Sequence, residues 1–190
     1  MDYFVIDVET APVDTKKYSE TLDEKKAEFL NPLDSKIVAI GLRYKNENKV
    51  FLDLKDEKKI LEDFWAEWSS IKRGNPSFAV VGFNINAFDL PMLVGRSFIQ
   101  NVSVSAFVLK EIIDLRQKLS VYAYKPRGKL KEYAELVGLD IGPENGSMVA
   151  NWVEQGKTEV LSKYLKSDLE ITDALFKRAE NLNIIQINKW

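Results

Sequence analysis

The sequence predicts an α/β fold built on a mixed sheet of five strands, with helices on both faces. The chain opens with a β-branched, aromatic run at 3–8, which indicates a buried strand. Two further strand-like runs follow and are expected to form a hairpin, and beyond them strand and helix patterns alternate. Three antiparallel strands followed by this alternation are typical of one mixed-sheet domain, which we expect to span residues 1–190.

The expected elements follow from local patterns. Asp56 and Ser147 are suited to cap helices, and the sequence NEN at 46–48 is suited to the hairpin turn. Apolar residues at helical spacing indicate the helices, and Gly74-Asn75-Pro76 is expected to end one of them. Strands are expected at 3–8, 36–44, 49–54, 78–83 and 111–113. Helices are expected at 22–30, 56–71, 89–99, 115–119, 129–137, 147–155 and 158–181.

The composition narrows the available chemistry. The chain has no Cys and no His, which excludes thiolate metal sites, cysteine nucleophiles and every histidine-dependent mechanism. Metal sites made only of carboxylates favour Mg²⁺, Mn²⁺ or Ca²⁺. The formal net charge of −2 argues against broad coating of nucleic acid, but a local basic patch can still hold a strand. Neither a signal-peptide pattern nor an apolar stretch of about 20 residues is present, so we expect a cytoplasmic protein without a membrane partner.

Acidic side chains stand at three places where predicted elements meet. Asp7 and Glu9 are two apart at the end of the first strand, so they point to the same face. Asp89 lies at a strand–helix junction, where open α/β sheets bind ligands. Tyr164 and Asp168 are four apart in the last helix and share one face. Taken singly, each has an ordinary alternative: a solvated strand edge, a helix N-cap at Asp89, and a common pair on a helix.

Taken together, the pattern resembles the tyrosine branch of the DEDD superfamily of 3′–5′ exonucleases. The order is D-x-E, then N-x-x-x-F-D, then Y-x-x-x-D. The likeness is to stand-alone homologues of the proofreading exonuclease domain of family B DNA polymerases. It is carried by FVIDVET at 4–10, VGFNINAFDLPML at 81–93 and YLKSDLEITDALF at 164–176, with GKLKEYAELVGL at 128–139 before the third motif. The resemblance implies a ribonuclease H-like fold and a nuclease activity.

The resemblance also implies a site for two divalent metal ions, Mg²⁺ or Mn²⁺. Asp7, Glu9 and Asp168 would hold the first ion, and Asp7 would bridge to the second. Asp89 would act nearby, partly through water, and Tyr164 would hold the attacking water. The other branch of the superfamily uses a His for that last role, and this chain has none. Two ions of this kind clamp the attacking and leaving oxygens of a phosphodiester.

The same resemblance suggests residues that contact the strand. Thr10 would help to bind the terminal 3′ hydroxyl, and Asn84 would touch the terminal nucleotide. Phe88 either stacks on a base or packs in the core. The run KPRGKLK is the strongest local basic patch, and within it Arg127 and Lys129 either contact phosphates or belong to a solvated charge run.

The expected function is a metal-dependent 3′–5′ exonuclease that hydrolyses phosphodiester bonds at the 3′ end of single-stranded DNA and releases nucleoside 5′-monophosphates, as in DNA repair. RNA is the alternative substrate, since related tyrosine-branch enzymes trim RNA. A rival of another class is a catalytically idle nucleic-acid-binding subunit of a replication or repair complex. The presence of all four carboxylates and the tyrosine favours the enzyme. A replication or repair protein would then be its partner in trans.

Overall fold

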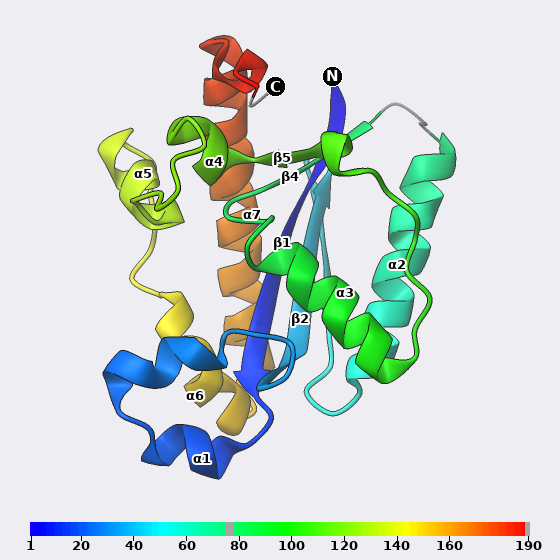
Figure 1. The fold of residues 1–190 in the computed structure, drawn as a ribbon, viewed down its shortest axis with the longest axis vertical. Helices are drawn as coiled ribbons and strands as arrows, with labels where there is room; N and C mark the ends of the chain where they lie inside the picture. Colours follow the sequence, from blue (N-terminus) through cyan, green and yellow to red (C-terminus); the bar gives the residue numbers. More distant parts are fainter. Residues whose placement is uncertain (75–77, 189–190) are drawn as a thin grey trace.

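The computed structural model describes residues 1–74 and 78–188. Within these residues, five strands form one sheet in the order β3-β2-β1-β4-β5 (Figure 1). They are β1 (Asp2–Pro12), β2 (Ser35–Tyr44), β3 (Glu47–Leu52), β4 (Phe78–Gly82) and β5 (Ile112–Asp114). β1, β2 and β3 pair antiparallel, whereas β4 pairs parallel with both β1 and β5. The predicted mixed five-stranded sheet is therefore confirmed.

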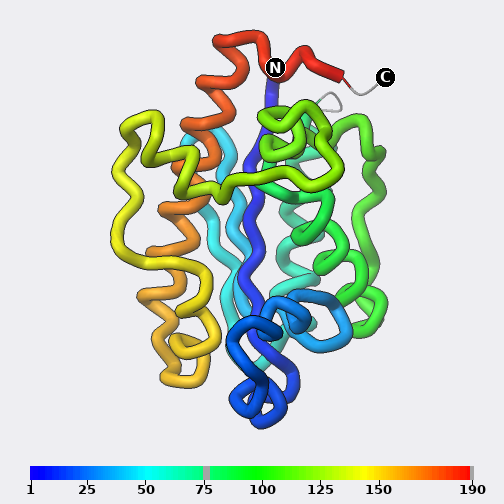
Figure 2. Tube along the Cα trace, turned by 60° about the vertical axis from the view of Figure 1, so that its left-hand side comes forward, coloured from blue at the N-terminus to red at the C-terminus, as the bar shows by residue number. Residues whose placement is uncertain are grey.

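Helices cover both faces of the sheet (Figures 1 and 2). One face packs against α2 (Glu57–Gly74) and α3 (Asp89–Gln100). The other face packs against α5 (Leu130–Leu136), α6 (Val149–Glu154) and the long α7 (Thr158–Asn181). The remaining helical segments are α1 (Thr15–Glu20), η1 (Asp23–Phe29), η2 (Leu109–Glu111), α4 (Leu115–Leu119), η3 (Gly146–Met148) and η4 (Ile184–Gln186).

The central strand β1 alternates between the two cores. Phe4, Ile6 and Val8 pack on the side of α2 and α3. Val5 packs with α7 residues, and Ala11 packs with residues of α6 and α7. Because strand residues two apart share a face, the side chains between Val5 and Ala11 with the same parity project towards α7. These are the positions of the first two predicted carboxylates.

The hairpin between β2 and β3 turns one residue earlier than predicted. Lys45 and Asn46 have φ of 49° and 67°, whereas Glu47 and Asn48 already pair with β2. A two-residue turn with positive φ at both positions matches the right-handed twist of the two strands, so it is favoured over a longer NEN turn.

Other local expectations have mixed outcomes. Asp56 caps α2 as predicted, accepting a hydrogen bond of 2.9 Å from the Lys59 amide. The helix predicted over 22–30 is present as the 3-10 helix η1, whereas α1, which precedes it, was not predicted. Ser147 does not cap α6, because it lies within η3 and donates its amide proton to Asn145 Oδ1. α2 ends at Gly74 as predicted, whereas Asn75 and Pro76 lie outside the described residues.

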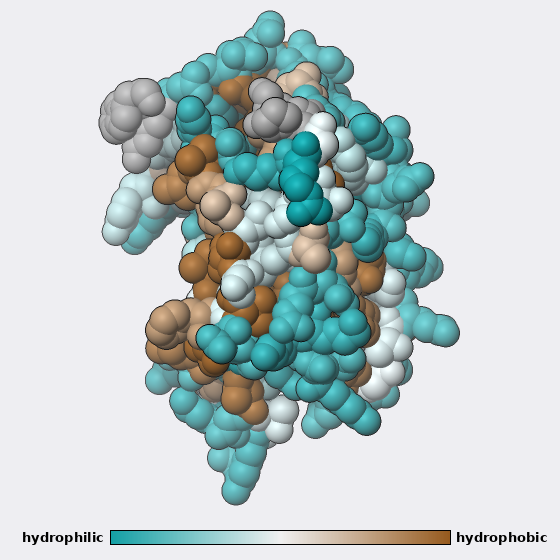
Figure 3. All heavy atoms as spheres, turned by 90° about the vertical axis from the view of Figure 1, so that its right-hand side faces the viewer, coloured by the Kyte–Doolittle hydropathy of each residue, from teal (hydrophilic) through white to brown (hydrophobic). Residues whose placement is uncertain are grey.

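The surface on the α2 side is mainly hydrophilic, with apolar groups gathered along one edge (Figure 3). Among the described residues, the large apolar side chains that are exposed to solvent include Phe98 of α3, at 87% exposure, and Leu136 of α5, at 84% exposure. No helix in the described part of the chain is both long and apolar enough to cross a membrane.

Candidate active site

The sheet and α7 bring the first and third predicted motifs together. Asp7 and Glu9 project from β1 on the face that α7 covers. Tyr164 and Asp168 lie one turn apart on α7, and both are buried, at 7% and 5% exposure. The helix approaches β1 closely at this level because the residue paired with Asp7 on β2 is Gly41, which has no side chain to hold it away.

Three carboxylates form a compact cluster, which we call the carboxylate triad: Asp7, Glu9 and Asp168. One oxygen from each lies within 4.8 Å of the others. Asp168 is buried, and Asp7 and Glu9 are half-buried. Asp168 Oδ1 is shielded from solvent and has no hydrogen-bond partner among the described residues. A buried carboxylate oxygen without a partner is costly, so the arrangement calls for a positive charge.

The pKa values of the triad also indicate that it needs a positive charge. Burial raises the pKa of Asp7 well above its usual range, and the charges of Glu9, Asp89 and Asp168 raise it further. Burial, and then the charges of Asp168 and Asp89, also raise the pKa of Glu9 well above its usual range. Two carboxylates about 5 Å apart repel each other by roughly 3 kcal/mol at an effective dielectric of 20. The charged triad is therefore unfavourable without a counter-ion.

The residues of the triad fit a divalent metal ion. Carboxylate oxygens are the ligands that Mg²⁺ and Mn²⁺ prefer, and Asp7, Glu9 and Asp168 each bring one such oxygen to the cluster. The donor set contains no sulfur or imidazole, so zinc-type and copper-type sites are disfavoured. The metal requirement predicted for these three residues thus agrees with their geometry.

Asp89 lies beside the triad but not within it. Its Oδ1 accepts a hydrogen bond of 3.0 Å from the amide of Val8, the residue between the two β1 carboxylates. The position of the N-cap of α3 belongs to Phe88, which makes no capping bond, so the N-cap alternative for Asp89 is wrong. Burial raises the pKa of Asp89 to about 7. Direct binding of a metal by Asp89 remains a prediction.

Tyr164 lies against the triad with a strongly perturbed hydroxyl. Its ring packs against Trp152 of α6, with ring centroids 5.4 Å apart. Burial, followed by the charges of Glu9 and Asp168, raises the pKa of the Tyr164 hydroxyl far above its usual range. The raised pKa favours the neutral phenol, which acts as a hydrogen-bonding group.

Lys131 is a site residue whose role the sequence did not reveal. Its Nζ lies 3.7 Å from Asp168 Oδ1 and 4.6 Å from the centroid of the Tyr164 ring. It also donates a hydrogen bond to the backbone carbonyl of Glu144. Burial raises the pKa of Asp168, and the charge of Lys131 opposes part of that rise. In the sequence, Lys131 is one cation in a basic run, and no local signal separates it from its neighbours.

The loop after β4 is held in place by two charged residues. Asn84 has a φ of 68°, and its amide donates to Asp114 Oδ1 at 3.0 Å. The amide of Asn86 donates to Asp114 Oδ2, and Asp114 also caps α4 through the amide of Gln117. Arg116 Nη1 donates to Asn84 Oδ1 at 3.1 Å, and its Nη2 donates to the carbonyl of Pro126. Arg116 therefore ties this loop to the basic run.

The other predicted substrate-binding residues lie around the triad on separate elements. Thr10 follows Glu9 and lines a cavity of about 690 Å³. Arg127 and Lys129 are both exposed, in the loop before α5. Phe88 is half-buried and packs against the core on the α2 and α3 side, which agrees with the packing alternative for this residue. Contact of any of these residues with a strand remains a prediction.

Comparison with known proteins is consistent with the site geometry. The model of a family described as "Predicted 3′-5′ exonuclease related to the exonuclease domain of PolB" matches residues 27–111, which include Asp89. An uncharacterized protein of Methanocaldococcus jannaschii is 31% identical over 171 residues, which cover 83% of this chain and 93% of that protein. The DNA polymerase 2 of Aeropyrum pernix is 25% identical over 171 residues, which cover 78% of this chain.

The chain corresponds to a limited part of the polymerases. It covers 21% of the Aeropyrum polymerase. The structure of the family B DNA polymerase from the hyperthermophilic archaeon Pyrobaculum calidifontis superposes with a TM-score of 0.71 over 97% of this chain and 25% of that one, at 17% identity. This similarity shows a shared ribonuclease H-like fold. With a relative of nearly equal length above 30% identity and the matched family model, the chain belongs to the family of predicted 3′–5′ exonucleases related to the exonuclease domain of PolB.

Proposed function

We propose that the protein is a metal-dependent 3′–5′ exonuclease that acts on single-stranded DNA and releases nucleoside 5′-monophosphates. The observation that supports this most directly is the carboxylate triad, in which one oxygen from each residue lies within 4.8 Å of the others, while Asp168 Oδ1 has no hydrogen-bond partner among the described residues. Three clustered carboxylates are costly unless they hold a cation, which favours a metal-dependent reaction at this point. Membership of the exonuclease family supports the same reaction.

Each residue of the site has a role that follows from its surroundings. Asp7, Glu9 and Asp168 would hold the metal, with Asp89 supporting a second ion beside Asp7. When bound, divalent ions lower the pKa of water and offset the charge that develops on the phosphodiester oxygens. Tyr164 positions the attacking water, because its neutral hydroxyl can hydrogen-bond to water but cannot act as a base. Positioning of this kind lowers the entropic part of the barrier.

The strand end would lie across the loop after β4 and the basic run. Arg116 occupies the Oδ1 of Asn84, so the free end of that amide is its Nδ2, a donor. A donor at this point suits an oxygen of the terminal nucleotide. Arg127 and Lys129 are exposed and would contact phosphates further along the strand. Thr10 adjoins the triad in sequence and would contact the terminal sugar.

The test uses single-stranded DNA and RNA oligomers of one sequence, each labelled at the 5′ end. The wild-type protein is incubated with either oligomer and Mg²⁺ or Mn²⁺, beside Asp7→Asn and beside Asp63→Asn. Asp63 is a matched control, because it is exposed on α2 and paired with Lys59, away from the triad. We expect a ladder that shortens from the 3′ end with DNA as the faster substrate, present in Asp63→Asn, absent in Asp7→Asn and absent with EDTA.

The alternatives give distinct results. A faster RNA ladder would overturn the choice of DNA and leave the reaction in place. Binding of both oligomers without any ladder would contradict the proposed activity and favour a nucleic-acid-binding subunit. Cleavage that persists in Asp7→Asn would remove the triad from the reaction.

A further inference from the structure

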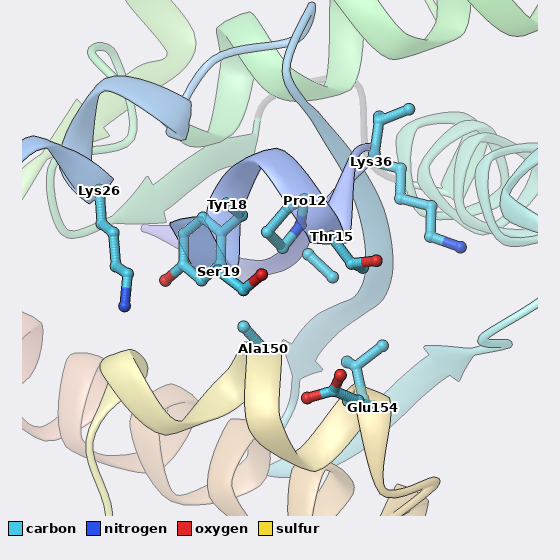
Figure 4. Close-up of a pocket in the computed structure, with 11 residues that line it drawn as sticks. Pro12, Thr15, Tyr18, Ser19, Lys26, Lys36, Ala150 and Glu154 are labelled. Carbon is cyan, nitrogen blue, oxygen red and sulfur yellow. The ribbon is translucent and has the colours of Figure 1, made fainter. Parts of the chain in front are cut away.

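A hollow lies between α1 and α6, and Figure 4 shows the residues that line its smaller part. It consists of two adjoining cavities of about 550 Å³ and 690 Å³, which share Pro12, Tyr18, Lys26 and Ala150 in their linings. Each is large enough for a nucleotide-sized ligand. None of the motifs that predict the exonuclease accounts for Tyr18 or Lys26.

The larger cavity is lined by two residues that adjoin the active site, although neither the triad nor Tyr164 lines it. Thr10 and Gly146 both line it. Thr10 follows the triad residue Glu9 in β1, and a Cβ built on Gly146 would lie 3.5 Å from the Tyr164 hydroxyl. A strand end held at the triad therefore has this hollow directly beside it.

Tyr18 and Lys26 are held in position at the wall of the hollow. The Tyr18 ring packs edge-on against buried Phe29, with centroids 5.3 Å apart, and Lys26 Nζ lies 5.1 Å from the Tyr18 centroid. Figure 4 shows the Tyr18 hydroxyl and the Lys26 ammonium side by side, both directed to the side where Ala150 of α6 lies. The small side chains of Pro12 and Ala150 leave space in front of these two donors.

Each cavity is lined by two lysines and one carboxylate, but these groups differ in how free they are to bind a ligand. At the Thr10 end, Lys26 and Lys129 line the larger cavity together with Asp23. Asp23 pairs with Lys26 at 2.6 Å, but its side chain is 94% exposed, so water can replace this partner. The smaller cavity has Lys36 and Glu154 in place of Lys129 and Asp23, and Lys36 Nζ already donates a hydrogen bond of 3.1 Å to the carbonyl of Leu54. Two ammonium groups and a phenol hydroxyl beside the active site are the donors that a phosphate group requires.

We infer that the larger cavity is a second phosphate-binding site, in which Lys26, with Lys129 and the Tyr18 hydroxyl, takes a phosphate of the strand other than the one that is cleaved. This inference rests on the proposed function, since it places a strand end at the triad. The phosphate has two potential sources. It is either an internal phosphodiester near the strand end or a phosphate carried on the terminal 3′ oxygen.

The test compares Lys26→Ala with Lys25→Ala in the absence of metal, where nothing is cleaved. Lys25 is a matched control, because it is the exposed neighbour of Lys26 in η1 and does not line either cavity. Binding of a 5′-labelled single-stranded oligomer is measured by fluorescence anisotropy across a range of salt concentrations. We expect Lys26→Ala to weaken binding roughly three- to tenfold and to reduce the salt slope by about 0.7, with Lys25→Ala close to wild type.

Two further arms identify the source of the phosphate. Oligomers ending in a 3′ hydroxyl or a 3′ phosphate are compared, and neutral methylphosphonate linkages are placed singly near the 3′ end. A terminal phosphate predicts tighter binding of the 3′-phosphorylated oligomer by wild type and no such gain in Lys26→Ala. An internal phosphate predicts one linkage whose neutralisation weakens wild type and has no effect on Lys26→Ala.

The inference fails if Lys26→Ala matches Lys25→Ala in affinity and salt slope, or if its loss of affinity is independent of every phosphate change. Tyr18→Phe, which keeps the ring contact with Phe29, checks that a loss does not come from disturbed folding: we expect a smaller but measurable weakening.

Failure here is distinguishable from failure of the proposed function. A 3′ ladder with unaltered binding by Lys26→Ala overturns only this site, and a Lys26-dependent phosphate effect without a ladder overturns only the exonuclease.

Discussion

Gly41 of β2 lies directly opposite Asp7 of β1, and its missing side chain gives α7 its place over the sheet. A Cβ at this position would lie 2.8 Å from Leu169 Cδ1 and 2.9 Å from Leu165 Cγ. Those two leucines flank Asp168 on α7. The distance between the carboxylates of β1 and the carboxylate of α7 therefore depends on a residue that carries no chemistry of its own.

Substitution of Gly41 by Ala should separate the two halves of the site. We expect Gly41→Ala to destabilise the fold by about 1–3 kcal/mol, because the added methyl group overpacks the contact with α7. The cleavage rate should fall further than stability alone explains. Gly95→Ala is the matched control, since its Cβ would meet Pro32 at 2.7 Å, away from α7. Urea unfolding and cleavage assays measure both effects, and equal activity in the two variants would contradict this role of Gly41.

Lys131 should stabilise the metal-free protein and compete with the metal. Its Nζ lies 3.7 Å from Asp168 Oδ1, so Lys131→Met leaves the carboxylates without their nearest cation. We expect the free energy of unfolding without metal to drop by about 1–2 kcal/mol at pH 8 and the affinity for Mn²⁺ to rise. The exposed neighbour Lys129, changed to Met, serves as the control in urea unfolding and calorimetry. A weaker Mn²⁺ affinity in Lys131→Met would show that Lys131 assists the metal instead.

Tyr164→Phe should reduce the rate while the fold is retained. The ring contact with Trp152 survives the change, and only the hydroxyl near the triad is lost. We expect a decrease in kcat of about 10- to 1,000-fold, with little change in the melting temperature. Tyr44→Phe, which removes a hydroxyl that donates to Asp2, is the control. Turnover at the wild-type rate would remove Tyr164 from the mechanism.

The stability of the metal-free protein should depend on pH through Asp89. Burial raises the pKa of this carboxyl to about 7, whereas its ordinary value is 3.8. The folded state therefore prefers the protonated form. The stabilisation that comes from protonated Asp89 in the folded state is full below about pH 4 and is lost as the pH rises through 7.

Asp89→Asn isolates this effect, because Asn keeps an oxygen that can accept from the Val8 amide and cannot ionise. We expect the stability of wild type relative to Asp89→Asn to fall between pH 5 and pH 8 in urea unfolding without metal. Mn²⁺ affinity should rise over the same range, since the carboxylates must lose protons to bind a cation. Parallel pH profiles of the two proteins would contradict the raised pKa.

The sequence predicts those parts of the site that depend on one element at a time. The period of two in a strand places Asp7 and Glu9 on one face, and the spacing of four places Tyr164 and Asp168 together on a helix. The apolar spacing of the last helix predicts that one of its faces packs on a core, but not which strand it covers. The order of the motifs then indicates the fold family, which the comparisons confirm.

The remaining parts depend on how elements pack, which local patterns do not record. Lys131 reaches Asp168 only because α5 packs beside α7. Asp89 at the start of α3 accepts a hydrogen bond from the Val8 amide of β1, a contact between two elements that the local sequence around Asp89 does not indicate. The twist of β2 and β3 favours a two-residue turn, which falls at Lys45 and Asn46. Neither residue is a glycine, so the sequence does not mark the position of this turn strongly.

The central claim is that Asp7, Glu9 and Asp168 bind a divalent metal ion. Titration calorimetry of the metal-free protein with Mn²⁺ tests it most directly, with Asp7→Asn as the altered site and Asp63→Asn as the control. We expect saturable binding by wild type and Asp63→Asn and a loss of at least about tenfold in affinity for Asp7→Asn. The metal-free melting temperature of Asp7→Asn should equal or exceed that of wild type, because one repelling charge is gone. No Mn²⁺ binding by wild type, or equal binding by Asp7→Asn, would contradict the claim.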